Sequence, residues 1–364
     1  MNIEQGKISD FQLFLLITGF IEGSILLTSF ASNLVKHNTW LVILSGLVFI
    51  VPFVYIFAWL AKRFPGKNFA LINRMVYGTY LGTTISILYL GYFLLTLSFN
   101  IRDLGNFYTT FFMRDTPLEV FLIVFTFTCA YAVWNGIEVL ARICPFIVGT
   151  VILFVISATL MLFTKINFSN LLPLGELSLS FKNFLHGVQI ITEIPFGELV
   201  VFLTIYLALH GNQHTATATL SGLLLGAALF MVISIRNTAI LGDTEAFLLS
   251  PSCQVVRLIN FGFLSRMDIL FAAGYILGMF FKCSILFYGV ILLLSQLLCL
   301  RTYSPLIFPL GCVAIILAII VYPSMGEHFK TSQNTGIMFT SPFVHIFPVL
   351  TMFITKIRNL PKKG

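Results

Sequence analysis

The stretch ITEIPFGELVVF, residues 191–202, lies inside a long apolar run and yet contains a proline, a glycine and two glutamates. Pro195 removes a backbone donor and clashes with the preceding turn, which costs about 3 kcal/mol in an ordinary helix interior. Gly197, two residues later, permits non-helical backbone angles. Together these two residues predict an interrupted helix, with the carboxylate of Glu198 beside the interruption.

The composition of the whole chain is that of a protein in lipid. Its 364 residues are 58% hydrophobic and only 10% charged, with a mean hydropathy of +0.98, whereas a soluble domain carries roughly 25% charged residues. Apolar runs of about 20 residues, long enough to cross about 30 Å of hydrocarbon, recur along it. We therefore predict an all-α polytopic membrane protein, a single membrane domain over residues 1–364, whose surroundings are a lipid bilayer rather than nucleic acid.

Ten transmembrane helices are expected from these runs. They lie near residues 11–31, 39–61, 80–103, 118–134, 143–164, 184–209, 215–241, 269–299, 304–322 and 338–357. An N-terminus inside the cell puts the basic segments 62–74 and 356–363 on the cytoplasmic side, as the positive-inside rule favours, so both termini are expected there. The six cysteines form no CxxC pair, and no nucleotide-binding or Ser-His-Asp pattern occurs. We therefore expect no cofactor, no metal site and no enzymatic activity.

The first predicted span repeats the pattern of the sixth. Its sequence ITGFIEGSIL, residues 17–26, places Gly19, Glu22, Gly23 and Ser24 near the middle of an apolar run. The glycine spacing alone is typical of helix packing, but a packing groove has no use for an acid. Corresponding interruptions in two halves of a chain indicate a substrate site between inverted repeats, here about residues 8–164 and 184–357.

A zwitterionic amino acid would suit such a site, because free helix N-termini attract its carboxylate while acids and unwound carbonyls attract its ammonium. Glu22 and Glu198 are candidates to hold that ammonium, or to carry a coupling proton. Lys282, deep in the eighth span, is either the counter-ion of one of these acids or a lysine that snorkels to the surface. Tyr89 and Tyr92 either line the cavity or pack the third span against its neighbours.

Short motifs in a fixed order point to a known family. They are RFPGK (63–67), TPLEV (116–120), GIEVLARI (136–143), NLLPL (170–174), PFGE (195–198), RNTAILG (236–242) and LSRMD (264–268). Over roughly residues 8–300 this ordered set resembles the spore germination permease family, the B subunits of nutrient germinant receptors.

The resemblance implies the five-plus-five inverted-repeat fold of the amino acid/polyamine/organocation superfamily, with helices one and six broken. It also implies a place in the spore inner membrane beside A and C partner subunits, and a role in sensing a small nutrient, typically an amino acid. The PFGE match carries Pro195, Phe196, Gly197 and Glu198 over as the family's broken sixth helix. Arg236 and Asn237, and likewise Arg266, Met267 and Asp268, match family positions without an assigned role.

The first span departs from the family pattern. Related sequences have a glycine-rich, neutral break that ends in a proline, whereas this chain has Glu22 and no proline in LLTSF, residues 26–30. The departure leaves room for a cationic group or a proton near Glu22. Physical reasoning alone equally favours a proton-coupled amino-acid transporter, which would move its solute by alternating access.

Overall fold

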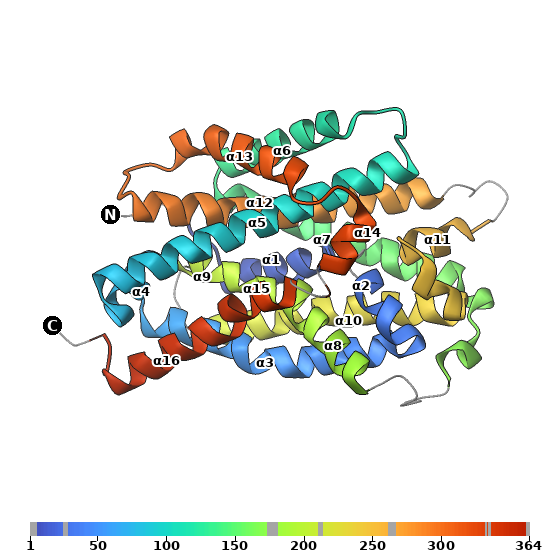
Figure 1. Ribbon diagram of the computed structural model, residues 1–364, viewed down its shortest axis with the longest axis horizontal. Helices are drawn as coiled ribbons and strands as arrows, with labels where there is room; N and C mark the ends of the chain where they lie inside the picture. Colours follow the sequence, from blue (N-terminus) through green and yellow to red (C-terminus); the bar gives the residue numbers. More distant parts are fainter. Residues whose placement is uncertain are drawn as a thin grey trace.

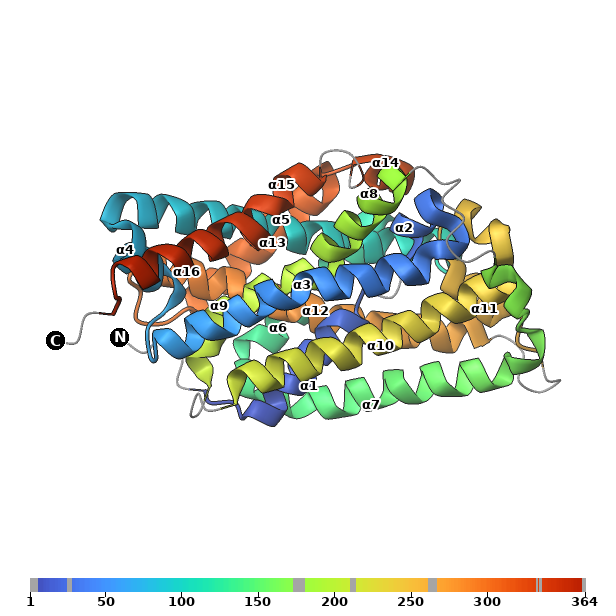
Figure 2. The ribbon, with the colours of Figure 1, turned by 90° about the horizontal axis from the view of Figure 1, so that it is seen from below.

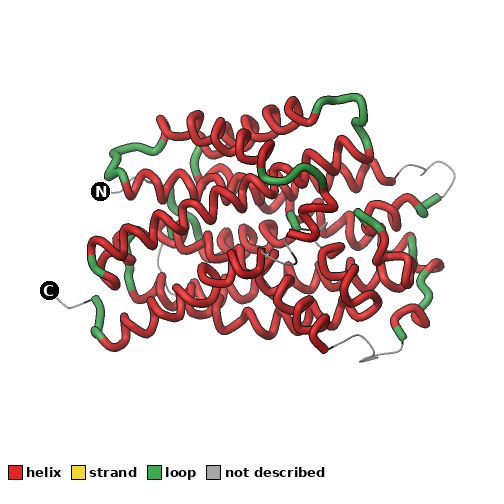
Figure 3. The backbone as a smooth tube through the Cα atoms, viewed as in Figure 1, coloured by secondary structure: helices red, strands yellow, loops and turns green. Residues whose placement is uncertain are grey.

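The computed structural model describes residues 6–24, 28–172, 181–209, 214–260, 267–331, 333 and 336–361, and in these ranges the chain consists of helices and loops without a β-strand (Figures 1 and 3). The α-helices are α1 (Asp10–Glu22), α2 (Thr28–Val35), α3 (Thr39–Arg63), α4 (Phe69–Tyr77), α5 (Thr79–Phe111), α6 (Leu118–Trp134), α7 (Ile137–Met161), α8 (Phe181–Ile191), α9 (Phe202–Ile205), α10 (Thr215–Leu241), α11 (Pro251–Arg257), α12 (Met267–Leu297), α13 (Ile307–Ile320), α14 (Met325–Thr331), α15 (Ile337–Ser341) and α16 (Phe347–Ile357). Shorter helical turns are η2 (Lys36–Asn38), η3 (Phe163–Lys165), η4 (Phe168–Leu171), η5 (Thr192–Phe196), η6 (Gly197–Val201), η7 (Tyr206–Ala208), η8 (Gly242–Phe247), η9 (Ser304–Leu306) and η11 (Pro342–Ile346).

The described helices include 7 that are long and apolar enough to cross a membrane, and two shorter apolar ones at Leu118–Trp134 and Ser304–Ile320. They run along the long axis of the bundle (Figures 1 and 2). The chain is therefore a multi-pass membrane protein, while the expected number of ten spans stays a prediction. The third span differs from its expected range of 80–103, because α5 continues to Phe111. Arg102 and Asp103 lie buried within this helix instead of marking its membrane border.

Two spans form the centre of the bundle. In their most apolar windows, the segment Phe181–Ala208 is 89% buried and α12 is 83% buried, whereas the other long spans are between 33% and 50% buried. Around them α5 packs on α12, α3 packs on α10, and α1 packs on α7, α10 and α12. The half-buried spans expose apolar side chains that suit contact with lipid, and the two central spans hold the features of the candidate site.

The first span is interrupted after Glu22, as expected. Helix α1 ends there, Gly23 and Ser24 form a turn, and α2 begins at Thr28. Gly23 itself has right-handed helical angles (φ −58°, ψ −14°). Its missing side chain matters for contact instead, since a Cβ atom would lie 2.7 Å from the carbonyl oxygen of Gly278 in α12.

The sixth span is also interrupted, but at a different residue from the one expected. Ile194 has extended angles (φ −133°, ψ 111°), whereas Gly197 has helical angles (φ −68°, ψ −28°). The residue before a proline is disfavoured in the helical region, so Pro195 shifts the irregular position to Ile194. The expectation that Gly197 supplies the non-helical angles is therefore wrong. A Cβ atom on Gly197 would lie 2.9 Å from the methyl groups of Val344, so this glycine allows close contact with the last span.

The first and last described residues lie at the same end of the bundle (left in Figures 1 and 2). Two hydrogen bonds join the C-terminal tail to the end of α3 and to α4 at this end. Arg63 Nε donates to the carbonyl oxygen of Leu360 at 2.6 Å, and Arg358 Nη1 donates to that of Val76 at 2.7 Å. The two basic segments that were expected on one side of the membrane therefore do lie together.

Candidate functional site

A buried ion pair joins three of the spans at the centre of the bundle. Lys282 of α12 is fully buried, and its Nζ atom lies 2.5 Å from Oε2 of Glu198 in η6. The same ammonium donates a hydrogen bond of 2.8 Å to the hydroxyl of Ser24, just beyond α1, and lies 5.5 Å from the ring centroid of Phe20. A buried charge is costly unless it is paired and hydrogen-bonded. Of the two alternatives for Lys282, the structure has the ion pair, and Glu198 is the acidic partner.

The glycines of the first span allow this meeting because they bring α1 close to its neighbours. A Cβ atom on Gly23 would lie 2.8 Å from Cβ of Lys282, so any larger residue would displace the lysine. A Cβ atom on Gly19 would lie 3.0 Å from Cγ2 of Val148 in α7 and 3.1 Å from the ring of Phe281 in α12. Both glycines therefore serve helix packing, and the packing places Ser24 within reach of the ammonium.

Glu22 does not take part in this pair. Its side chain is buried, neither carboxyl oxygen has a hydrogen-bond partner within the described ranges, and it lies in a narrow apolar pocket beside Val151, Phe230 and Ile233. Residues two positions apart near a helix end point in roughly opposite directions, about 200° around the axis, so Glu22 faces α7 and α10 while Ser24 faces α12. The expectation that the two acids face one shared pocket is wrong.

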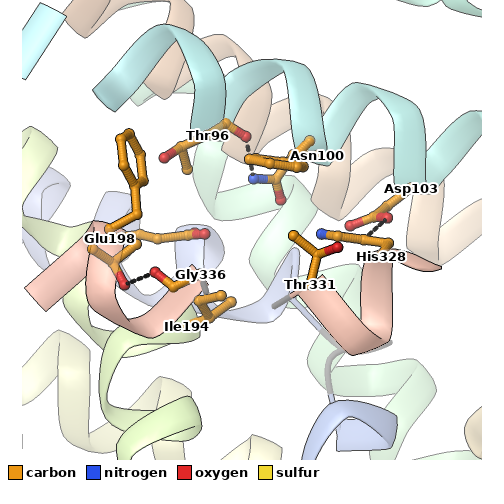
Figure 4. Close-up of a pocket in the computed structure, with 11 residues that line it drawn as sticks. Thr96, Asn100, Asp103, Ile194, Glu198, His328, Thr331 and Gly336 are labelled. Atoms are coloured by element: carbon orange, nitrogen blue, oxygen red, sulfur yellow. Dashed lines mark hydrogen bonds and ion pairs between the residues drawn. The ribbon is translucent and has the colours of Figure 1, made fainter. Parts of the chain in front are cut away.

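A cavity of about 60 Å³ lies beside Glu198 and extends toward α14 and α15 (Figure 4). It is lined by Thr96, Phe99, Asn100, Asp103, Ile194, Glu198, His328, Thr331, Gly336, Phe339 and Thr340. The polar side chains of α5 recur at spacings of four and three residues, so they share one face of that helix. The candidate residues of the first and eighth spans do not line this cavity, and residues of α14 and the last span line it together with the third and sixth spans.

The end of the cavity toward α14 holds a cluster that sequence reasoning missed. Oδ1 of Asp103 accepts a hydrogen bond from the hydroxyl of Tyr322 and lies 2.7 Å from Nδ1 of His328. The imidazole lies nearly parallel to the rings of Phe99 and Tyr322, with centroid distances of 5.1 and 4.3 Å. The neighbouring Arg102 guanidinium lies 5.6 Å from the Tyr322 ring centroid.

A signal for part of this cluster was present in the sequence. Asn100, Arg102 and Asp103 interrupt an otherwise apolar stretch. The expected third span ends at residue 103, and no role was predicted for these three residues. His328 lies in the connection between the last two predicted spans, and no local pattern relates it to Asp103, 225 positions earlier.

The sixth-span interruption is connected to the last span through Glu193, the first of the two glutamates in the stretch 191–202. Glu193 is fully buried, and its two carboxyl oxygens accept hydrogen bonds from the hydroxyls of Thr340 and Ser341 in α15. Gln189, one turn earlier, donates to Oε1 at 3.5 Å. Glu193 therefore connects the break to the helix that covers the cavity.

The two tyrosines of the third span pack against the same last span. The hydroxyl of Tyr89 donates to the carbonyl oxygen of Phe343 at 2.8 Å, and the ring of Tyr92 stacks on that of Phe343 at 4.6 Å. Both side chains are buried, and neither lines the cavity. These contacts are those of the packing alternative, and a part for either tyrosine in binding stays a prediction.

The remaining family positions connect helices at the end of the bundle away from the termini, where α11 lies (right in Figures 1 and 2). Asn237 of α10 accepts from Arg236 at 3.1 Å and donates to Ser252 of α11 at 2.8 Å. Asp268 of α12 pairs with Arg257 of α11 at 3.2 Å. Met267, the first residue of α12, is buried, and Arg266 lies outside the described residues. These contacts give the two motifs a role in joining α10, α11 and α12.

Interrupted helices with buried charges beside a cavity, inside a bundle of apolar helices, are typical of membrane transport proteins. The profile of the spore germination protein family matches residues 7–356, and the chain belongs to this family. It is 28% identical to spore germination protein KB of Bacillus subtilis (strain 168), over 100% of this chain and 99% of that protein. It is 26% identical to the putative spore germination protein YfkT of the same strain, over 74% of this chain and 75% of that protein.

Solved structures of a transporter share the fold. Mhp1, a nucleobase-cation-symport-1 family transporter, in a closed conformation with bromovinylhydantoin bound, matches with a TM-score of 0.69 and 14% identity, over 97% of this chain and 79% of that chain. An inward-facing conformation of Mhp1 matches with a TM-score of 0.50, over 98% of this chain and 90% of that chain. The chain is therefore a membrane germination protein with a transporter fold, as predicted, while the boundaries of the two expected repeats stay a prediction.

Proposed function

We propose that this protein is the membrane subunit of a spore nutrient-germinant receptor, and that it binds a small nutrient of the amino-acid class in the cavity beside Glu198. The cavity carries the proposal: it adjoins the interrupted sixth helix and is bordered by charged side chains inside an apolar bundle. Such groups are costly within a membrane and generally mark functional positions. Its volume of about 60 Å³ suits a small solute.

Binding would act by shifting a conformational equilibrium. The cavity wall comes from α5, from the interrupted sixth span and from α14 and α15. A nutrient in contact with all of these segments binds more tightly to the arrangement in which they lie together, and so favours that arrangement. The A and C subunits of the receptor would read this shift. No chemical step is needed, so we propose no enzymatic activity.

The location of the cavity agrees with a nutrient that arrives from outside. We place the protein in the spore inner membrane, with both termini and their basic segments on the core side, as the positive-inside rule favours. Asp103 lies about 10 Å further along α5 than Thr96, in the direction away from the termini. In this orientation the end of the cavity at Asp103 and α14 is turned toward the outer side of the membrane.

A proton-coupled amino-acid transporter is the second candidate, and the fold shared with Mhp1 favours it. A transporter would accumulate solute without any partner subunit. Uptake of radiolabelled amino acids by vesicles that contain only this chain separates the two functions. Accumulation driven by a proton gradient would favour the transporter, and its absence alongside an intact germination response would favour the receptor.

Filling the cavity tests the proposal. Thr96→Phe places an aromatic ring in the cavity, and spores with this variant are expected to need at least tenfold more amino acid to germinate, with an unchanged level of the protein. Thr84→Phe, on an exposed position of the same helix, is the matched control and should leave the response unchanged. A normal dose–response curve for Thr96→Phe would contradict a nutrient site in this cavity.

A further inference from the structure

We infer that Asp103 is the group that recognises the ammonium of the nutrient, and that His328 occupies this carboxylate until the nutrient binds. The inference rests on the proposed function, and it assigns the substrate class and a specificity-determining residue. It depends on how the charges of the cavity are partnered.

The two carboxylates of the cavity have different partners. Glu198 is paired with the fully buried Lys282, which Ser24 also holds, so its charge is satisfied inside the protein. Asp103 is partnered by the imidazole of His328, from the short helix α14 at the cavity edge, and by Tyr322 just before it. At Asp103 an incoming ammonium would compete with His328 and Tyr322, which both come from one segment at the cavity edge, whereas at Glu198 it would compete with a fully buried ammonium. Asp103 is therefore the more accessible acid for a ligand.

The lining favours a cation over an anion. Among the described residues that line the cavity there is no lysine or arginine. Lys282 lies behind Glu198, and the guanidinium of Arg102 is directed to the carbonyl oxygens of Ile319 and Pro323 at 3.5 Å. The rings of Phe99 and Phe339 line the cavity, and an aromatic ring can attract an ammonium or cover a short apolar side chain. A primary amine, including an amino acid, fits this lining better than a simple organic acid.

Binding at Asp103 would exchange one hydrogen bond for another. An ammonium N–H group would take the position of Nδ1 of His328 on Oδ1, with no change in covalent bonds. The imidazole would keep its near-parallel contacts with Phe99 and Tyr322 or move away together with α14. Occupancy of the cavity would thus change the contacts of α14, a helix in the half of the bundle away from the termini (Figures 1 and 2).

Ligand-induced thermal stabilisation of the purified full chain in lipid nanodiscs tests this inference, with two matched sets of probes. The first is L-alanine with ethylamine and propionate, and the second is L-valine with isobutylamine and isovalerate. The amino acid or the amine of at least one set should stabilise the wild type at concentrations where neither carboxylate does. Stabilisation by the carboxylates alone, or by none of the six probes, would overturn the inference.

Variants assign the effect to Asp103. Asp103→Asn should weaken amine binding at least tenfold, and Asp103→Glu should restore part of it. Asp115→Asn, on the exposed loop after the same helix, should bind like the wild type. His328→Phe retains a ring in the stack but cannot donate to Asp103, and it should tighten amine binding several-fold. Unchanged binding in Asp103→Asn, or weaker binding in His328→Phe, would contradict the inference, and the second result does so even if Asp103→Asn fails to fold.

Germination of spores with the same variants separates this inference from the proposed function. If amines bind through Asp103 in nanodiscs but spores with Asp103→Asn and spores with Thr96→Phe both respond normally to every common amino acid, the amine site at Asp103 stands and the receptor function fails. If Thr96→Phe abolishes the response while Asp103→Asn preserves both response and binding, the cavity is the nutrient site and the role of Asp103 is refuted.

Discussion

Replacing Lys282 by methionine removes the ammonium at the centre of the bundle and keeps most of the side-chain volume. In the wild type this group is fully buried, lies 2.5 Å from Glu198 and donates to Ser24. Removing one partner of a buried ion pair leaves the other charge uncompensated, which typically costs about 3–5 kcal/mol. We expect Lys282→Met to lower the free energy of unfolding by about this amount, and Glu198→Gln to have an effect of similar size.

The double variant distinguishes a true pair from two separate effects. With both Lys282→Met and Glu198→Gln, no charge remains uncompensated, and the combined loss should be at least about 2 kcal/mol smaller than the sum of the single losses. Unfolding of the purified chain in mixed micelles with increasing SDS, followed by circular dichroism, gives the four free energies of the cycle. Glu22→Gln replaces Glu198→Gln in a control cycle and should give no recovery, because Glu22 lies in a different pocket. Additive losses, or equal recovery with Glu22→Gln, would refute the pairing.

Three further predictions use the same unfolding assay. Gly23→Ala should lower the free energy of unfolding by about 1–3 kcal/mol through overpacking, because its Cβ would lie 2.7 Å from the Gly278 oxygen. The control Gly91→Ala, whose Cβ would have no atom within 4 Å, should be within about 0.5 kcal/mol of the wild type. Equal effects would argue against the close approach of α1 and α12. Glu22→Leu should raise the free energy of unfolding by about 1–2 kcal/mol, because a buried acid without a hydrogen bond is replaced by an apolar group. A free energy of unfolding below that of the wild type would indicate a partner for this carboxyl group. Thr340→Val combined with Ser341→Ala should lower the free energy of unfolding by about 2–3 kcal/mol, because Glu193 loses two hydrogen-bond donors. The control is Thr84→Val, at an exposed position. A loss as small as that of the control would show that α15 does not depend on this contact.

The features that the sequence predicted are those in which a single residue carries a large local cost. Pro195 cannot continue a regular helix, so the interrupted sixth span followed from its position. Lys282 is too costly in lipid without a counter-ion, so an acidic partner within the bundle was expected. Both features appear in the structure, and the apolar runs alone were enough to predict a helical membrane protein.

The features that were missed depend on the direction of side chains and on contacts between distant segments. Glu22 does not meet Lys282 because it lies on the side of α1 that faces α7 and α10, and the apolar run of the first span does not give that orientation. Asp103 received no role because it is the last residue of the expected third span, and its partner His328 comes from a segment 225 positions later. Gly197 was interpreted as a conformational residue, whereas its role is to allow contact with Val344.

A cryo-electron microscopy structure of the protein with a bound amino acid tests the central claim most directly. The ligand would be the common amino acid that germinates wild-type spores at the lowest concentration, added in excess to the full chain with its partner subunits. We predict density in the cavity between α5, the interrupted sixth span and α15, with the ammonium beside Asp103. Density at Glu22 between α7 and α10, or elsewhere with this cavity unoccupied, would contradict the account.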